Sequence, residues 1–456
     1  MRILIAGAGE TGIALARYLR AENHEIVMID KNPDVLEGIS EQLDIQTLTG
    51  SCDSPLVLER AGADSVDILL AMTGDDQSNI IACSLAKELF RVSKRIARVS
   101  SNDYLMPKYS AFLKALSVDV VVSPEVETAN QILTSLAING ATDMTILGRG
   151  LVRFLGLKCR SDIPLLGKTL TQLHRQLDEL NISVVAVVRR HQLMDLKKVT
   201  LQVGDEVYFF VDTAHLPYAL DIFGCTEIPL DYVLMFGGGS VGFQTAKALE
   251  ADSDDTQITL LERDKNRAGF LAEHLKRSLV IHGDGFDDTV LDDLDLRANQ
   301  VSIATTQSDE NNVLLSLMAK RAGVRRTCAL VRNTLYKQYL RGLGVDILIN
   351  PNAVMVSAVL QCLRKGRLNN DYFLQSGMGE VLEMDALKTS RITSLLFERL
   401  NIPKGVQIGG VLRKGKFIRP HKGFRVMEGD KVFVFVQRGQ VARAEKLFTV
   451  RLSFFA

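Results

Sequence analysis

The first 124 residues alternate between short apolar runs and longer amphipathic stretches. The apolar runs have the length and composition of buried strands and lie at residues 3–6, 26–29, 68–71, 96–99 and 118–122. Apolar side chains recur at helical spacing in residues 12–22 and 76–90, and residues 36–43 and 56–61 fit the same scheme. Mainly apolar strands that alternate with helices predict a parallel sheet covered on both faces.

The same pattern returns further along the chain. RILIAGAGETG (residues 2–12) recurs as VLMFGGGSVG (residues 233–242), EIVMID recurs as QITLLE, and LLAMTGDDQSN recurs as VSIATTQSDENN. Three blocks keep their order with only small changes in spacing. We therefore predict a duplicated unit rather than separate chance matches.

A smaller β-rich unit follows each copy. LQVGDEVYFFV (residues 201–211) recurs as RVMEGDKVFVFV (residues 425–436), and each reads as a Gly-Asp turn followed by a strand. The predicted fold class is α/β: two Rossmann-like domains with doubly wound parallel sheets, each followed by a small β-rich α+β domain. We place the four domains at residues 1–124, 142–226, 231–350 and 370–454.

A glycine-rich turn separates the first strand from the first helix. Gly7, Gly9 and Gly12 form the pattern GxGxxG, and Asp30 ends the next strand. The first glycine permits a tight turn, the second lets a diphosphate approach the backbone, and the third lets the helix pack on the strand. The helix N-terminus offers free N–H groups to an anion, and a carboxylate at the position of Asp30 accepts the ribose hydroxyls. This order predicts a nucleotide fold.

The second unit keeps the same chemistry with Gly237, Gly239, Gly242 and Glu262. An acid at this position repels the 2′-phosphate of NADP, which argues against that cofactor. The acids do not separate NAD from ATP or ADP, because each of these ligands has a ribose diol and a diphosphate.

A TxxDxxN pattern follows another strand in both units. It comprises Thr73, Asp76 and Asn79 in the first unit, and Thr306, Asp309 and Asn312 in the second. Ligands bind at the carboxyl ends of strands in open α/β sheets, so we expect Thr73 and Gly74 to contact a ligand. Asp76 fits either ligand contact or a helix cap, and both alternatives stay open.

Arg98 lies within the predicted strand 96–99, an unusual place for a charge. It can reach a phosphate, or it can pair with a carboxylate at a subunit contact. The aligned residue of the second unit is Leu330, and Arg332 is expected on the same strand and the same face as Leu330. The two sites are therefore expected to differ in affinity or in ligand.

Composition and charge exclude several classes of protein. The 54 basic and 54 acidic residues leave no net charge, which makes nucleic acid a poor candidate partner. The six cysteines and seven histidines lack metal-ligand spacing and fit a protein of the reducing cytosol. No apolar run approaches the roughly 20 residues that span a bilayer, so we expect any work at a membrane to occur by docking from the cytosol.

Two motifs resemble those of enzymes without the context that the chemistry needs. GGGSVG contains the hydrolase pattern GxSxG, but Glu10 takes the place of Ser240 in the first copy. Tyr104 and Lys108 have the YxxxK spacing of dehydrogenases, but Pro107 argues against the helix that this pair requires. No general base, nucleophile or metal site accompanies either crevice, so we predict a sensor without catalytic residues. The alternative is an NAD-dependent oxidoreductase with the β-rich units as substrate lids.

The blocks AMTGDDQSNIIACSLAKELF and RIARVSSNDY, together with the Gly-Asp module, carry a family resemblance. The chain resembles the tandem RCK (KTN) proteins, the peripheral subunits of bacterial Trk potassium-uptake systems. The resemblance implies that NAD(H) or ATP/ADP binds in both Rossmann-like domains. It assigns the first site to Gly7, Ala8, Gly9, Glu10, Thr11, Gly12, Asp30, Thr73, Gly74 and Arg98. It assigns the second site to Gly237, Gly238, Gly239, Ser240, Val241, Gly242, Glu262, Thr305 and Thr306.

The resemblance also implies how the protein works. It predicts a non-enzymatic regulatory subunit on the cytoplasmic face of the inner membrane, and it implies no metal. Such lobes assemble into a ring, expected here to be a homotetramer, below the membrane-embedded potassium-pore subunit. Ligand binding would change the shape of the ring and so gate transport.

Overall fold

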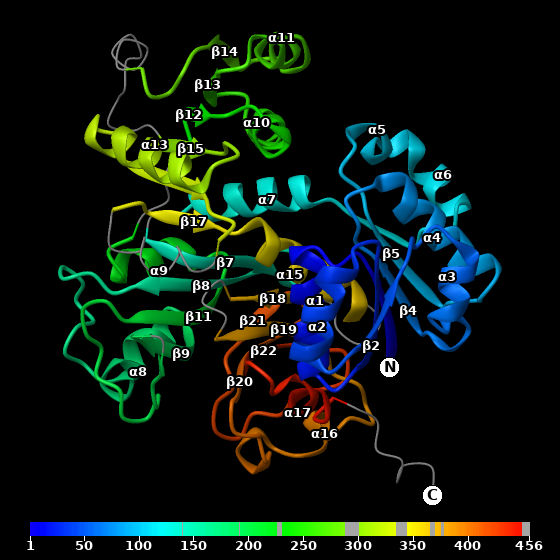
Figure 1. Cartoon of the computed structure of the whole chain (residues 1–456). Helices are drawn as coiled ribbons and strands as arrows, with labels where there is room; N and C mark the ends of the chain where they lie inside the picture. Colours follow the sequence, from blue (N-terminus) through cyan, green and yellow to red (C-terminus); the bar gives the residue numbers. More distant parts are fainter. Residues whose placement is uncertain are drawn as a thin grey trace, which may run out of the picture.

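The computed structural model describes residues 1–138, 140–190, 192–225, 230–287, 301–333, 344–364, 370–374 and 378–448. In these residues the strands form four sheets (Figure 1). The end of the fourth predicted domain, residues 449–454, lies outside the described residues. No helix in the described ranges is both long enough and apolar enough to cross a lipid bilayer.

The first sheet is parallel and has the strand order β3-β2-β1-β4-β5-β6. Its strands are β1 (Arg2–Ala6), β2 (Glu25–Asp30), β3 (Gln46–Thr49), β4 (Ile68–Ala71), β5 (Lys94–Arg98) and β6 (Val120–Val122). The helices are α1 (Glu10–Ala21), α2 (Pro33–Leu43), α3 (Pro55–Arg60), α4 (Asp76–Glu88), α5 (Asn102–Leu105) and α6 (Ser110–Ala115). We call this part the first Rossmann lobe.

Both faces of this sheet are buried, as the apolar strands predicted. Along β1, Ile3 and Ile5 belong to one hydrophobic cluster, whereas Leu4 and Ala6 belong to the cluster on the opposite face. Successive side chains of a strand point to opposite faces, so a strand covered on both sides needs an unbroken apolar run. The predicted parallel Rossmann-like sheet is therefore confirmed.

The second Rossmann lobe repeats this architecture with the strand order β14-β13-β12-β15-β16-β17. Its strands are β12 (Tyr232–Phe236), β13 (Gln257–Glu262), β14 (Leu279–His282), β15 (Val301–Ala304), β16 (Arg326–Leu330) and β17 (Ile347–Ile349). Its helices are α10 (Ser240–Asp252), α11 (Lys265–His274) and α13 (Asp309–Arg321). The equivalent order of strands confirms the duplication.

Each small unit, here called a C-lobe, holds a five-stranded sheet in which all paired strands are antiparallel. The first C-lobe contains β7 (Ala141–Leu147), β8 (Val152–Lys158), β9 (Ser183–Arg189), β10 (Gln192–Leu193), β11 (Glu206–Asp212), α8 (Leu170–Glu179) and α9 (Leu216–Ile222). The second contains β18 (Asn370–Phe373), β19 (Gly379–Asp385), β20 (Val406–Arg413), β21 (Lys416–Ile418), β22 (Lys431–Gln437), α16 (Arg391–Ser394) and α17 (Val441–Glu445). Phe154 and Phe210 of the first sheet share a cluster with Phe433 and Phe435 of the second, so the two C-lobes pack on each other.

The Gly-Asp turns of the C-lobes are built alike. Gly204 and Gly429 have φ values of +88° and +83°, a conformation that favours glycine. Arg189 donates to Asp205 from Nε at 2.7 Å, and Arg413 donates to Asp430 from Nε at 2.8 Å. Both aspartates are buried, so their pairing with arginine fixes the turn before the strand.

Two helices exchange places between the Rossmann lobes. The helix α7 (Pro124–Leu136) follows the first lobe but packs on the second, where Ile132 joins the core with β12. The helix α15 (Pro351–Arg364) follows the second lobe but packs on the first, where Met355 joins the core with β1. Figure 1 shows α7 beneath α10 and α15 beside α1. We call α7 and α15 the crossover helices.

A basic side chain from the opposite lobe holds the C-terminus of each crossover helix. Arg326, the first residue of β16, donates to the carbonyls of Leu136 and Ser135 at the end of α7, each at 2.8 Å. Lys94, the first residue of β5, donates to the carbonyls of Cys362 and Leu363 near the end of α15. A cation at a helix C-terminus satisfies free carbonyls and opposes the helix dipole.

Candidate functional site

In each Rossmann lobe the predicted site residues gather at one edge of the sheet. In the first lobe they come from the loop between β1 and α1 and from the ends of β2, β4 and β5. In the sheet β2 and β4 lie on either side of β1, and β5 lies next to β4. The strands are parallel, so their carboxyl ends lie together at this edge. The second lobe assembles its residues in the same way from β12, β13 and β15.

The glycines of the first loop have the properties that the motif predicts. Gly7 has φ +106°, and a Cβ there would lie 2.9 Å from the backbone of Met72. A Cβ on Gly12 would lie 1.9 Å from the carbonyl oxygen of Gly7, so α1 packs on the loop without room for a side chain. Apart from its chain neighbours, Gly9 has no described residue within 4 Å of such a Cβ. The loop is closed at its ends and open in the middle, as an approaching diphosphate requires.

The second loop has the same shape. Gly237 has φ +92°, and a Cβ on Gly242 would lie 2.1 Å from the carbonyl oxygen of Gly237. Gly239 faces open space. Gly238 differs from Ala8 of the first lobe, because a Cβ there would meet Cδ1 of Leu271 at 2.1 Å. This packing explains the extra glycine in GGGSVG.

The acids at the strand ends are fixed by backbone N–H groups. Asp30 accepts from Ala8 at 2.6 Å through Oδ2 and from Asn32 at 2.8 Å through Oδ1. Glu262 accepts from Gly238 at 2.7 Å through Oε2 and from Asp264 at 2.9 Å through Oε1. A carboxylate has about four lone-pair sites, so both acids keep capacity for further donors. Each acid is thus held next to its glycine loop and can accept from a ribose diol.

A buried asparagine organises the end of β4. Asn79, which is 0% exposed, accepts from the hydroxyl of Thr73 at 2.7 Å and donates to the carbonyl of Arg98 at 3.0 Å. Asn312 makes the same contacts with Thr306 at 2.7 Å and with the carbonyl of Leu330 at 3.0 Å. Each asparagine ties two neighbouring strand ends together. The TxxDxxN pattern placed these asparagines at the site without revealing this role.

The aspartate of the same pattern is not the helix cap. Asp75 caps α4 by accepting from the backbone N–H of Gln77. Asp76 instead accepts from the backbone N–H groups of Ser100 at 2.9 Å and Ser101 at 2.8 Å, and so holds the segment that follows β5. The cap hypothesis for Asp76 is therefore wrong.

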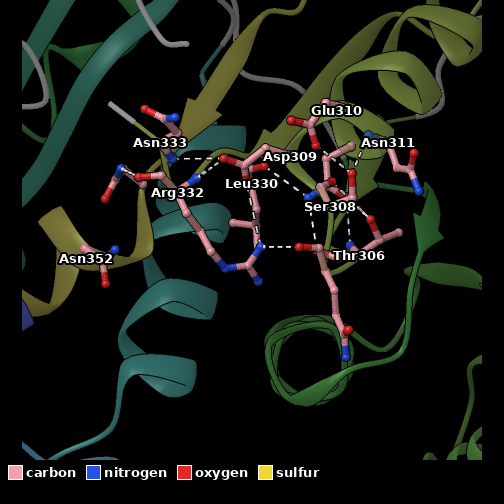
Figure 2. A network of polar contacts seen from close by, with 12 residues as sticks. Thr306, Ser308, Asp309, Glu310, Asn311, Leu330, Arg332, Asn333 and Asn352 are labelled. Carbon is pink, nitrogen blue, oxygen red and sulfur yellow. Dashed lines mark hydrogen bonds and ion pairs between the residues drawn. The ribbon is translucent and has the colours of Figure 1, made fainter. Parts of the chain in front are cut away.

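The second lobe repeats this contact. Asp309 accepts from the backbone N–H groups of Arg332 at 2.9 Å and Asn333 at 2.8 Å (Figure 2). Thr305, which the resemblance assigns to the second site, donates from its hydroxyl to the carbonyl of Gly237 at 2.8 Å. This hydrogen bond joins the end of β15 to the glycine loop.

Arg98 is half-buried at the end of β5, and its Nε is buried without an acceptor. Within the part of the chain that the structure describes, its side chain has no hydrogen bond or ion pair. Leaving a buried donor unpaired is costly, and a bound anion would supply the missing acceptor. The charge therefore fits a phosphate of a ligand held at this edge.

Arg332 does not replace Arg98 in the second lobe. The strand β16 ends at Leu330, which is 1% exposed, so the prediction that Arg332 lies on the same strand is wrong. Arg332 lies in the following segment, where its Nη1 donates to the carbonyl of Gln307 at 3.0 Å and lies 3.6 Å from Oδ1 of Asp309 (Figure 2). The strand ends there because Asp309 binds the backbone N–H of Arg332.

The cysteines of the chain are poor candidates for catalytic nucleophiles. All six cysteines are buried, and burial raises the pKa of the Cys52 thiol to about 11 and that of the Cys83 thiol to about 12. These thiols stay protonated at neutral pH and make poor nucleophiles. Among the described residues, no cluster of three or more His, Cys, Asp or Glu side chains could hold a metal ion.

The sequence matches the family model of the TrkA-N domain at residues 3–124 and 233–351. It matches the family model of the TrkA-C domain at residues 397–449. The Trk system potassium uptake protein TrkA of Azorhizobium caulinodans is 34% identical over 458 residues, with 100% of both chains covered. That of Halomonas elongata is 30% identical over 460 residues, again with 100% of both chains covered.

Solved structures share the fold. The GsuK RCK domain superposes with a TM-score of 0.61 and 19% identity, covering 98% of this chain and 94% of that chain. A GsuK channel bound to NAD gives a TM-score of 0.60 and 18% identity, with 98% and 78% covered. The relatives are named as potassium uptake proteins, which favours the regulatory hypothesis over the oxidoreductase. The duplicated lobes and the full-length similarity agree: the chain belongs to the TrkA family of Trk system potassium uptake proteins.

Proposed function

We propose that the chain is the nucleotide-binding regulatory subunit of a Trk-type potassium transporter, with one nucleotide site in each Rossmann lobe. The observation that carries the proposal is the repeated arrangement of an open glycine and a fixed acid. In the first lobe Asp30 binds the backbone N–H of Ala8, the residue before the open Gly9. In the second lobe Glu262 binds the backbone N–H of Gly238, the residue before the open Gly239. A single arrangement of this kind can belong to the fold without binding a ligand. Two arrangements that keep the same contacts favour nucleotide binding in both lobes.

The ligand class follows from the chemistry of the site. The backbone N–H groups at the start of α1, around Glu10 and Thr11, would hold the diphosphate, and Asp30 would hold the ribose diol. We propose NAD(H), ATP or ADP, each of which has both groups. The channel GsuK, which has the same fold, was solved bound to NAD, and this supports NAD as the first probe.

The proposed regulation is a shift between two shapes of the assembly. A ligand that binds one shape more tightly raises its population, and the coupling is limited by the difference in affinity. The crossover helices join the two Rossmann lobes and also contact the C-lobes through β7 and β18. A change in a Rossmann lobe can therefore reach the rest of the chain. The partner would be the membrane-embedded potassium-pore subunit, which the protein would meet from the cytoplasmic side.

Four chains are expected to form a closed ring below the pore subunit, because soluble oligomers favour closed symmetry. Light scattering on the purified protein should give the mass of a tetramer at micromolar concentration. The pore subunit, purified in detergent, should retain this tetramer on an affinity column. A stable monomer, with and without nucleotide, would contradict the proposed ring.

Replacing either acid should weaken nucleotide binding at its own site. We expect Asp30→Asn and Glu262→Gln each to weaken one binding step for NAD by about 5- to 10-fold, because a charged acceptor for the diol is lost. Isothermal titration calorimetry of the full chain measures both steps. Asp34→Asn is the matched control, since Asp34 is exposed on α2 and should leave both steps unchanged. Unaltered affinity in the doubly substituted protein would refute the site.

A further inference from the structure

The start of α15 touches the glycine loop of the opposite lobe. Asn352 accepts from the hydroxyl of Thr11 at 3.3 Å through Oδ1, and its Nδ2 donates to Oε2 of Glu10. Glu10 and Thr11 are the first residues of α1, where the diphosphate is expected. A residue from the end of the second Rossmann lobe thus holds the loop of the first nucleotide site.

The same segment is anchored in the second site. Asn350 caps α15 by accepting from the backbone N–H of Ala353 at 2.8 Å, and it donates to the carbonyl of Arg332 at 2.7 Å. Arg332 in turn donates to the carbonyl of Gln307, which adjoins Thr306 (Figure 2). Polar contacts of Asn350 and Asn352, joined by two residues of backbone, therefore connect the strand end of the second site to the start of α1 in the first.

A second link runs in the opposite direction. Asp76, in the first site, holds the backbone of Ser100 and Ser101. The next residue, Asn102, accepts a hydrogen bond from Nε2 of Gln244. Gln244 lies on α10, the helix that begins at the glycine loop of the second site. Each lobe thus connects its strand end to the loop helix of the other lobe.

The first of these links lies among charged side chains. Asn352 lies beside Glu10 in a crevice between the lobes that Arg17, Asp309 and Arg332 also line. A diphosphate at the start of α1 brings negative charge close to the exposed Glu10 carboxylate, which Asn352 holds. Any movement of that carboxylate alters its bond to Asn352 and thereby the start of α15. The buried helix interfaces then favour discrete arrangements over gradual deformation.

We infer that the two nucleotide sites are thermodynamically coupled, and that Asn352 and the Asn102–Gln244 contact carry the coupling. The inference rests on the proposed function, since it requires a nucleotide in each site. Coupling is reciprocal, so occupancy of either site changes the affinity of the other by the same factor. Asn352 and Asn102 are positioning residues here, because they act through the loop helices rather than through the ligand.

Calorimetry with NAD, and separately with ATP, tests the inference on the full chain. Asp30→Asn and Glu262→Gln give the affinity of each site while the other is impaired, and the unsubstituted protein gives the stepwise affinities. We expect the affinity of the second binding step to differ by about 5-fold or more from the value for independent sites. Combining Asn352→Ala with Asn102→Ala removes both links and should bring this factor close to one. The factor is the ratio of the two affinities of one site within the same variant, so a direct effect of the substitutions on affinity cancels.

The control is Asn130→Ala, the same change at an exposed position of the crossover helix α7, which should retain the coupling. Gln244→Ala breaks the second link from the other side and, combined with Asn352→Ala, repeats the test if the first pair fails to fold. Independent sites in the unsubstituted protein would overturn the inference while leaving the proposed function intact. Coupling that persists without the links would also overturn it. No binding of either nucleotide would refute the proposed function itself.

Discussion

Arg326→Met is expected to lower the free energy of unfolding of the second Rossmann lobe by about 3 kcal/mol. Arg326 is 2% exposed and donates to two buried carbonyls at the C-terminus of α7. Burial lowers the pKa of its guanidinium to about 10, so the group remains charged at neutral pH. Two hydrogen bonds from a charged group contribute roughly 1.5–3 kcal/mol each, and relief of the buried charge offsets part of their loss.

Hydrogen exchange locates this effect, because the amides of α7 should lose protection before those of the first Rossmann lobe. Arg325→Met is the matched control, because Arg325 precedes Arg326 and its side chain is exposed. A surface substitution of this kind changes the free energy of unfolding by no more than about 0.5 kcal/mol. Arg326→Lys should be intermediate, since an ammonium group cannot reach both carbonyls in the same geometry. Equal stabilities of Arg325→Met and Arg326→Met would show that the carbonyl contacts contribute nothing.

The apolar runs predicted the strands of the Rossmann lobes because the central strands there are buried on both faces of the sheet. The run at residues 3–6 is apolar on both faces, and the structure buries both faces. The edge strand β3 was not predicted, since its sequence QTLT is short, polar at three of four positions and at most half-buried. An edge strand receives little hydrophobic burial, so composition gives a weak signal for it.

The exchange of crossover helices could not be predicted from periodicity. The spacing of Ile132 and Leu136 shows that α7 has an apolar face but not which lobe covers it. The position of Arg332 was missed for a related reason. A strand pattern does not reveal that Asp309 captures the backbone of Arg332 and ends β16 at Leu330. Contacts between residues far apart in sequence decide both features.

Arg98→Leu is expected to weaken ATP binding at the first site by about 10-fold or more and NAD binding by less. The guanidinium of Arg98 has a buried Nε without an acceptor, whereas the equivalent Leu330 has no charge to offer. ATP carries more phosphate charge than NAD, so it should lose more when the charge is removed. The experiment is a titration with each nucleotide in the background Glu262→Ala, which weakens binding at the second site.

Arg332→Leu supplies the contrast at the second site in the background Asp30→Ala. Its guanidinium already contacts the carbonyl of Gln307 and lies near Asp309, so we expect a change of less than about 3-fold for either nucleotide. Arg98→Lys should recover part of the loss at the first site, because it keeps the charge but not the planar donor pair. If Arg98→Leu weakened the binding of ATP and of NAD equally, Arg98 would not contact the phosphates of the ligand. Its unpaired nitrogen would then point to a carboxylate supplied by another copy of the chain in the proposed ring.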